Sequence, residues 1–376
     1  MSTFIAFLFL FYCILVIMLI IGWRRAMQYS FFTKAHKTNH FISILVPARN
    51  EETNIASLLQ NLKLQSYPSY EVIVIDDHSD DNTFTMAEDF VFDEKIKVLH
   101  SNGNGKKQAL STGIAAASGK IIVTIDADCA VDVGWLEVIN NAFQNDNIKL
   151  AFGGVRIKGN DALFSSLQQL EFSSLIGSGA ATAKLGFPTM CNGANLAFRK
   201  EIFEEAGGYD DHIHIPSGDD EFLLRKVATM YPEGICFLNS KASVVTTQAT
   251  ETIKDLLHQR IRWAGKWKYN QSLNSKLLAI FIFVFQLSVI ATFILIVAGF
   301  ANAFLILIWI VKILLELLFL KQVNNFLGNK WKWLNFILLQ LIYPVYVVYI
   351  GLISNFKSFE WKGRKLKSIH SKPVYH

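Results

Sequence analysis

The segment IIVTIDADCA, residues 121–130, places two aspartates directly after a run of apolar and β-branched residues. An ionised carboxylate is costly to bury unless it is paired, hydrogen-bonded or open to water. A strand that ends in a solvated turn is one explanation of Asp126 and Asp128. A bound cation is another, because side chains two residues apart in an extended segment point to the same side, and Mg²⁺ or Mn²⁺ takes carboxylate oxygens as ligands.

Polar residues also follow two earlier apolar runs. VPARNEE (46–52) ends the first run and IDDHSDD (75–81) ends the second. In an open α/β sheet, ligands bind beyond the carboxyl ends of the parallel strands. Three polar strand ends at one edge of the sheet favour a bound cation over a solvated turn as the explanation of Asp126 and Asp128. A solvated edge without a ligand would, however, carry similar residues. A metal ion held by Asp126 and Asp128 would neutralise a diphosphate leaving group and orient it.

The elements that would position these residues are short apolar runs that alternate with amphipathic helices. Near-continuous hydrophobic runs are typical of parallel strands covered on both faces, and i, i+3, i+4 apolar spacing is typical of helices. The β-α-β-α order predicts a doubly wound α/β domain. We expect strands at 41–47, 71–76, 95–100, 120–126 and 149–157, and helices at 52–65 and 83–92.

Long apolar segments flank this domain. Hydrophobic residues make up 52% of the 376-residue chain and the mean hydropathy is +0.30, which is too apolar for an ordinary soluble protein. Residues 4–22 form a segment of 19 uncharged residues, which is long enough for a helix to cross a bilayer. The basic residues that follow this segment predict an uncleaved anchor. Further spans are expected at 277–300, 301–320 and 334–353, with Lys312 and Glu316 able to pair within one of them.

The membrane segments divide the chain into four parts. These are an N-terminal anchor at 1–23, the α/β domain at 24–275, about three C-terminal membrane helices at 276–355 and a basic tail at 356–376. Arg24, Arg25, Lys34 and Lys37 predict that the domain lies in the cytoplasm. The lysine-rich tail favours the same side, but four complete crossings would put it outside. A re-entrant or interfacial segment would resolve this conflict, and the sequence leaves it open.

Cysteines, charge and missing motifs narrow the possible functions. The four cysteines lack the spacing of a zinc site or disulfide framework, which fits a reducing cytosolic face. The net charge of +5, concentrated near the membrane boundaries, favours a lipid bilayer with anionic headgroups as a partner, and not nucleic acid. The absence of a phosphate loop, a G-x-G-x-x-G motif and a G-x-S-x-G motif argues against a P-loop ATPase, a dehydrogenase and an α/β hydrolase.

Seven short motifs together resemble those of a known family. In order they are VPARNEE, VIDDHSDD, GKKQALSTG, IDADC, CNGAN, GDDEFLLR and QRIRW. They strongly resemble the membrane-bound family 2 glycosyltransferases, which include cellulose, chitin and hyaluronan synthases and ceramide-glucosyltransferase-like enzymes. The resemblance runs from about Phe41 to Trp263, plus the flanking helices. It implies a GT-A fold, which is Rossmann-like, and inverting transfer from a nucleotide-diphosphate sugar, usually a UDP-sugar.

The resemblance also implies roles on the donor side. Asp77 would contact the uracil ring, Asp76 would support the same turn and Lys106 would line the nucleotide pocket. Asp126 and Asp128 would hold Mg²⁺ or Mn²⁺ against the diphosphate. The first motif would approach the nucleotide through Pro47, Ala48, Arg49, Asn50 and Glu51.

For the last two motifs, GDDEFLLR and QRIRW, the resemblance implies roles in acceptor activation and binding. An inverting transfer needs a carboxylate that takes the proton of the acceptor hydroxyl. The family pattern has Leu three residues and Arg six residues after this acid. The Leu fits if the acid is Asp220 and the Arg fits if it is Asp219, so both stay candidates, with Asp220 preferred. Gln259, Arg262 and Trp263 would share one helix face, with Arg262 near the diphosphate and Trp263 near the acceptor sugar.

The predicted function is that of an integral-membrane, metal-dependent hexosyl- or N-acetylhexosaminyl-transferase. CNGAN (191–195) would form a loop on its acceptor side. The enzyme is expected in the cell membrane, as in a bacterial inner membrane, with its domain in the cytoplasm. The acceptor would be a growing polysaccharide or a lipid-linked molecule, although three C-terminal spans are few for a translocating channel. The alternative is a catalytically silent subunit of a sugar-export complex.

Overall fold

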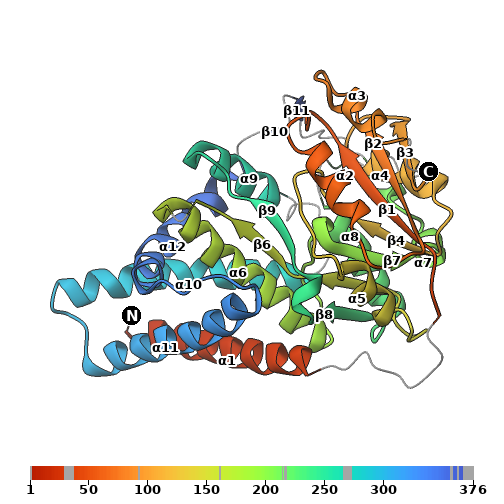
Figure 1. Ribbon diagram of the computed structural model, residues 1–376. Coiled ribbons are helices and arrows are strands. Elements are labelled where there is room, and N and C mark those ends of the chain that lie inside the picture. Colours follow the sequence, from red (N-terminus) through yellow and green to blue (C-terminus); the bar gives the residue numbers. More distant parts are fainter. Residues whose placement is uncertain are drawn as a thin grey trace, which may run out of the picture.

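The centre of the protein is a seven-stranded mixed sheet. The computed structural model describes residues 2–28, 38–91, 94–160, 162–213, 215, 218–265, 273–355, 359–361 and 364–366. The strand order is β3-β2-β1-β4-β7-β5-β8 (Figure 1). The strands are β1 (Ile42–Ala48), β2 (Tyr70–Asp76), β3 (Ile96–His100), β4 (Ile121–Thr124), β5 (Leu150–Gly153), β7 (Leu196–Arg199) and β8 (Ile235–Leu238).

The first four strands are parallel, as their continuous apolar runs predicted. All seven residues of β2 and all four of β4 are buried. Strands covered on both faces do not need alternating polar residues, which explains the pattern. Their carboxyl ends reach one edge of the sheet. β7 is antiparallel to both β4 and β5, which makes the sheet mixed.

A helix follows each of these four strands. They are α2 (Ile55–Lys63), α3 (Thr83–Glu88), α4 (Lys106–Ala116) and α5 (Trp135–Ala142). The helix α4 lies very close to the sheet, since a Cβ atom added at Gly113 would be 2.7 Å from Ile75 Cδ1 and 3.2 Å from Leu45. Gly113 therefore lets α4 bring its first residue, Lys106, close to the edge of the sheet.

One predicted strand is in fact two. Residues 149–157 divide into β5 and β6 (Val155–Lys158), and β6 pairs in parallel with β9 (Val245–Gln248) in a separate two-stranded sheet. The division falls at Gly153 and Gly154. A Cβ atom at Gly154 would be 2.9 Å from Leu327, so the bend needs a residue without a side chain. Apolar periodicity alone does not reveal such a change of sheet.

A long helix joins the sheet to the membrane helices. In α6 (Leu163–Lys184), the Ala181 carbonyl oxygen would be 2.6 Å from a Cβ atom at Gly22. A Cβ atom at Gly177 would be 2.5 Å from Val323 and 2.8 Å from Phe319. The other elements are α7 (Lys200–Glu205), α8 (Asp219–Met230), α9 (Ile253–Gly265), and the 3-10 turns η1 (Gly193–Asn195), η2 (Asp210–His212) and η3 (Lys241–Ser243).

In the part of the chain that the structure describes, four helices are long and apolar enough to cross a membrane. They are α1 (Ser2–Met27), α10 (Leu273–Val297), α11 (Ala303–Phe326) and α12 (Trp333–Ile353), and each overlaps a predicted span. Figure 1 shows α1, α10 and α11 running roughly alongside one another, whereas α12 runs across them. Lys312 and Glu316, which the sequence left able to pair, are 3.0 Å apart within α11.

The contacts of α12 agree with this oblique course. Lys332 Nζ, just before the helix, donates to Ser166 Oγ of α6 at 3.1 Å. Further along, Gln340 contacts α11, and Gly351 lies against Phe283 of α10. After α12, strand β10 (Phe359–Trp361) lies beside α9 and pairs with β11 (Arg364–Leu366). The rest of the predicted tail lies outside the described residues.

Candidate active site

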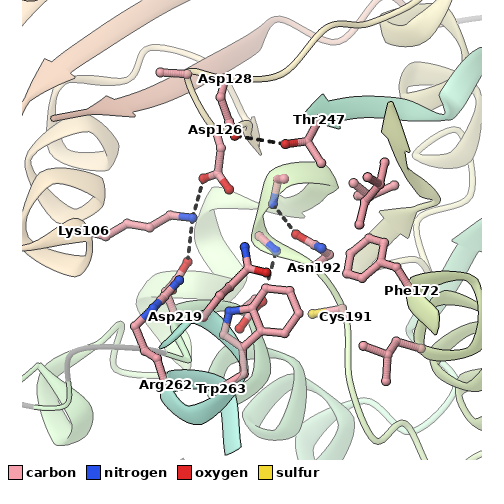
Figure 2. A pocket seen from close by; sticks show the side chains of 18 of the residues that line it. Lys106, Asp126, Asp128, Phe172, Cys191, Asn192, Asp219, Thr247, Arg262 and Trp263 are labelled. Atoms are coloured by element: carbon pink, nitrogen blue, oxygen red, sulfur yellow. Dashed lines mark hydrogen bonds and ion pairs between the residues drawn. The ribbon is translucent and has the colours of Figure 1, made fainter. Parts of the chain in front are cut away.

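A cleft of about 480 Å³ lies at the carboxyl ends of β1, β2 and β4. It collects the predicted site residues from six separate segments, and only Asn50 and Asp76 are not part of its lining. Figure 2 shows how the labelled side chains point toward a common space. The predicted residues that line it are Pro47, Ala48, Arg49, Glu51, Asp77, Lys106, Asp126, Asp128, Asp219, Asp220, Gln259, Arg262 and Trp263.

Asp126 and Asp128 lie in a turn and not on an extended strand. The strand β4 ends at Thr124, and the Cys129 N–H donates to the Asp126 carbonyl oxygen at 3.1 Å, which closes the turn. The expectation that an extended backbone aligns the two carboxylates is therefore wrong. Both still face the cleft, with separate partners: Asp128 Oδ2 accepts a hydrogen bond from Thr247 Oγ1 at 3.0 Å, and Asp126 pairs with a lysine (Figure 2).

That lysine, Lys106, connects acids of two motifs. Its Nζ lies 2.5 Å from Asp126 Oδ1 and 3.6 Å from Asp219 Oδ2 (Figure 2). Burial alone would lower the pKa of Lys106, but the negative charges of Asp126 and Asp219 raise that pKa above its ordinary value. The preceding Gly105 donates its N–H to Asp77 Oδ1 at 2.9 Å, which fixes the start of α4 beside the end of β2.

The acidic pair opens helix α8. Gly218, with φ of 87°, turns the chain into the helix in a conformation that favours glycine. Asp220 Oδ2 then accepts the Gly193 N–H at 3.1 Å. A Cβ atom at Gly193 would lie 2.9 Å from Asp219 Oδ2, so a residue without a side chain lets the CNGAN backbone approach both acids. Both aspartates line the cleft, and the choice of Asp220 as the base stays a prediction.

The first motif shapes the donor edge of the cleft. Arg49 donates to the Asp77 carbonyl oxygen at 2.8 Å and pairs with Asp80 at the same distance. Asn50 is in the left-handed region, with φ of 51°, and its Oδ1 accepts the Asp80 N–H at 2.9 Å. Asp76 is buried and accepts a backbone N–H of the same loop. In this structure Asn50 and Asp76 therefore support the loop that follows β2.

Helix α9 supplies another wall through Gln259, Arg262 and Trp263. Burial lowers the pKa of Arg262, and the nearby carboxylates oppose this change. Arg260, which was not predicted, is buried and pairs with Glu171 of α6 at 2.6 Å. Its guanidinium also lies 4.3 Å from the Trp263 ring centroid. Arg260 therefore holds α9 against α6 and positions the ring of Trp263.

Three further features in or beside the cleft have no signal in the motifs. Thr247 comes from β9, far from the acidic turn in sequence, and only the fold brings it there. The Tyr209 hydroxyl is buried without a hydrogen-bond partner among the described residues, and burial together with Asp219 raises the pKa of Tyr209. Phe172 and Ile176 of α6 give the cleft an apolar wall.

Comparisons of sequence place the first five of these motifs, up to CNGAN, in a family. Residues 43–207 match the family described as Glycosyl transferase family 2. The poly-beta-1,6-N-acetyl-D-glucosamine synthase of Staphylococcus epidermidis is 27% identical over 235 residues, covering 61% of this chain and 55% of that protein. The beta-monoglucosyldiacylglycerol synthase of Trichormus variabilis is 29% identical over 246 residues, covering 60% of this chain and 48% of that protein. The chain thus spans about half the length of these relatives.

A comparison of structures covers nearly the whole chain. The mannosyltransferase PcManGT from Pyrobaculum calidifontis, in complex with GDP-Man and Mn²⁺, has a TM-score of 0.58 and 17% identity, over 93% of this chain and 98% of that chain. At this identity the similarity shows the fold. The fold, the family match and the synthase relatives agree with one another. Residues 43–207 therefore form a glycosyl transferase family 2 domain with a GT-A fold, and four helices among the described residues fit membrane association.

Proposed function

We propose that the protein transfers a sugar, with inversion, from a nucleotide-diphosphate sugar to an acceptor at the cytoplasmic face of the membrane. The observation that carries the proposal is the single cleft in which the donor edge, the acidic turn, α8 and α9 meet. By their names, the two relatives make an N-acetylglucosamine polymer and a glucosyl lipid. A UDP-sugar donor is preferred because Asp77 matches the family residue that contacts uracil.

The acidic turn suits Mg²⁺ or Mn²⁺. Asp126 and Asp128 offer carboxylate oxygens, and Asp126 already lies against the positive charge of the Lys106 ammonium. The described residues contain no group of three or more His, Cys, Asp and Glu side chains that could hold a metal. Diphosphate and water oxygens would complete the coordination, as is usual for Mg²⁺. A bound ion would supply Lewis-acid chemistry to the diphosphate leaving group.

Separate residues of the chain would then bind the donor, take the acceptor proton and position the acceptor sugar. Asp77 and the first motif hold the nucleoside, and Arg262 holds diphosphate oxygens, which a planar guanidinium binds well. The Asp220 carboxylate, positioned by the Gly193 N–H, takes the proton of the acceptor hydroxyl. The oxygen attacks the sugar carbon on the side opposite the diphosphate, so the anomeric configuration inverts. Trp263 gives the acceptor sugar a flat surface.

The position of the cleft favours an acceptor that comes from the membrane. Phe172 and Ile176 of α6 face the cleft, while Gly177 of the same helix packs against Phe319 and Val323 of α11. An acceptor with an apolar part would meet this wall first. We therefore propose a lipid or lipid-linked glycan as acceptor. The orientation is supported by Arg24 and Arg25 in the last turn of α1; Lys34 and Lys37 lie outside the described residues.

The test is product analysis with one donor at a time. Membranes that contain the full chain are incubated with radiolabelled UDP-sugars and Mn²⁺, and matched membranes carry Asp220→Asn. We expect one sugar to enter a lipid-extractable or polymeric product, only with the unaltered chain. NMR of that product should show an anomeric configuration opposite to that of the donor.

Two outcomes would contradict the proposal. Retention of configuration would exclude the single displacement with Asp220 as base. No incorporation from any nucleotide sugar, with a correctly folded protein, would favour the silent-subunit alternative. Against that alternative, each acidic residue of the predicted catalytic and metal sets lines the cleft: Asp126, Asp128, Asp219 and Asp220.

A further inference from the structure

A second cleft, of about 740 Å³, lies on the other side of the acidic turn. Five basic side chains from three separate segments line it, and we refer to it as the basic cleft. Two come from β6, one from η3, and two from the connection between α11 and α12. These residues are Arg156, Lys158, Lys241, Lys330 and Lys332.

The charge of the basic cleft is strongly unbalanced. Its lining includes only two acidic residues, Asp128 and Asp132. Both already accept hydrogen bonds, Asp128 from Thr247 and Asp132 from the Gly134 N–H at 3.0 Å. Lys158, Lys241 and Lys330 are exposed. The site is therefore suited to an anionic ligand.

The basic cleft lies at the boundary of the membrane helices. Its lining continues from Phe326 and Leu327, at the end of α11, through Gly328 to Lys332, directly before α12. The Phe326 ring packs against Trp23 near the end of α1, with 5.5 Å between centroids. Trp333 is exposed at the start of α12. Tryptophan and lysine at the ends of apolar helices are typical of headgroup depth in a bilayer.

The two clefts share part of their lining. Asp128, Ile157 and Gln248 belong to both. Ala130, which follows the acidic turn and lines the basic cleft, exchanges backbone hydrogen bonds of 2.8 Å with Thr246 of β9. An occupant of the basic cleft would therefore lie against the backbone that carries Asp128.

We propose that the basic cleft binds the headgroup of an anionic phospholipid. Five cations at headgroup depth would pair with the phosphate of a lipid that carries net negative charge, and a zwitterionic headgroup would offset that charge with its own ammonium. The bound lipid would hold the edge of the sheet with Asp128 at the bilayer surface. Nothing in this proposal requires sugar transfer, so it can fail or succeed independently of the proposed function.

The test measures lipid binding by the full-length chain in detergent. Fluorescently labelled phosphatidylglycerol is titrated, and unlabelled phosphatidylglycerol, phosphatidylcholine or inorganic phosphate then competes. We expect only phosphatidylglycerol to compete. Each basic residue near an anionic membrane surface strengthens binding about fivefold, so Lys241→Gln with Lys330→Gln should weaken binding about 30-fold.

The control removes the same charge from two exposed residues outside the basic cleft, Arg25 at the end of α1 and Lys254 in the first turn of α9. Arg25→Gln with Lys254→Gln should change the affinity less than twofold, and Lys241→Arg with Lys330→Arg should bind like the unaltered chain. Equal weakening by the two glutamine pairs would mean diffuse surface attraction and overturn the proposal. Competition by phosphatidylcholine would also overturn it. Displacement by inorganic phosphate at low millimolar concentration would indicate a site for a soluble anion instead.

Discussion

Three of the four aspartates in the predicted catalytic and metal sets have different partners. Asp126 pairs with Lys106, Asp128 accepts from Thr247, and Asp220 accepts from the Gly193 N–H. Asp219 is the one that shares the lysine with Asp126, at the longer distance of 3.6 Å. The separate partners mean that substitutions at these acids should affect separate steps of the reaction.

The two aspartates of α8 can be told apart by substitution with asparagine. Asp220→Asn should keep near-normal UDP affinity and lose about 10²–10⁴-fold in transfer rate, because it preserves shape but takes no proton. Asp219→Asn should weaken UDP binding more than it lowers turnover, because it removes one of the charges that hold Lys106 in place. Calorimetric titration with UDP, alongside initial rates, measures both effects. Ordinary turnover in both variants would place the base elsewhere.

Thr247 is expected to act through Asp128. Thr247→Val removes the hydroxyl that donates to Oδ2 of this aspartate. Partners that orient a metal ligand typically contribute about 10–100-fold to metal affinity. The Mn²⁺ concentration for half-maximal transfer should therefore rise by at least about tenfold, with Thr247→Ser close to the unaltered chain. An unchanged Mn²⁺ dependence in the valine variant would refute this role.

At the scale of elements, the sequence predicted what local patterns control. The strands β1 to β4 were found because burial on both faces requires continuous apolar residues, and the helices α2 and α3 because of their apolar spacing. The division of 149–157 between two sheets depends on contacts of Gly154 with Leu327, almost 175 residues away. For the same reason, the pairing of Arg260 with Glu171 could not be read from QRIRW.

Polar contacts also connect the membrane helices. Glu316 of α11 accepts from Tyr12 of α1 at 2.7 Å and from Gln340 of α12 at 2.8 Å, and it pairs with Lys312. Lys312 in turn donates to Gln340 at 2.7 Å. Within apolar helices, such a set fixes which faces of the helices meet, because each member would otherwise lose its hydrogen bonds.

Removing one member of this ion pair should cost more than removing both. Glu316→Leu leaves the buried Lys312 ammonium without its carboxylate, and breaking a buried pair typically costs about 3–5 kcal/mol. The double variant Lys312→Leu with Glu316→Leu should recover a large part of that loss. Unfolding of the protein in mixed detergent micelles measures the difference. If both variants are destabilised equally, the pair contributes only through packing.

At the scale of the whole molecule, the course of α12 predicts an answer to the conflict over the basic tail. Its first residues follow Lys332, which contacts α6, and after its end β10 lies beside α9. Both α6 and α9 line the active-site cleft. Because both ends of α12 lie beside the catalytic domain, we predict that this helix does not complete a crossing. Three crossings, by α1, α10 and α11, would then leave the tail on the same side as the domain, as the basic residues on both favour.

This topology predicts how introduced cysteines react in intact cells. On a background without the native cysteines, Ala301→Cys between α10 and α11 should react with an impermeant maleimide. Lys95→Cys in the domain and Ser371→Cys in the tail should react only after the cells are permeabilised. Labelling of Ser371→Cys in intact cells would show that α12 crosses completely. Labelling of Lys95→Cys would reverse the orientation of the whole chain.

The packing of α6 has a consequence for any attempt to study the catalytic domain alone. Val16, Ile20 and Trp23 of α1 and Phe319 and Val323 of α11 belong to the same buried cluster as the central sheet. A soluble fragment cut at 38 and 265 would lose these residues and expose the apolar side of α6, whose opposite side lines the cleft. Such a fragment should aggregate, or bind donor poorly when kept in solution. Changes in bilayer thickness or fluidity would act on Phe172 and Ile176 of the cleft through the same contacts of α6. The rate of sugar transfer should therefore depend on the acyl chains of the surrounding lipids.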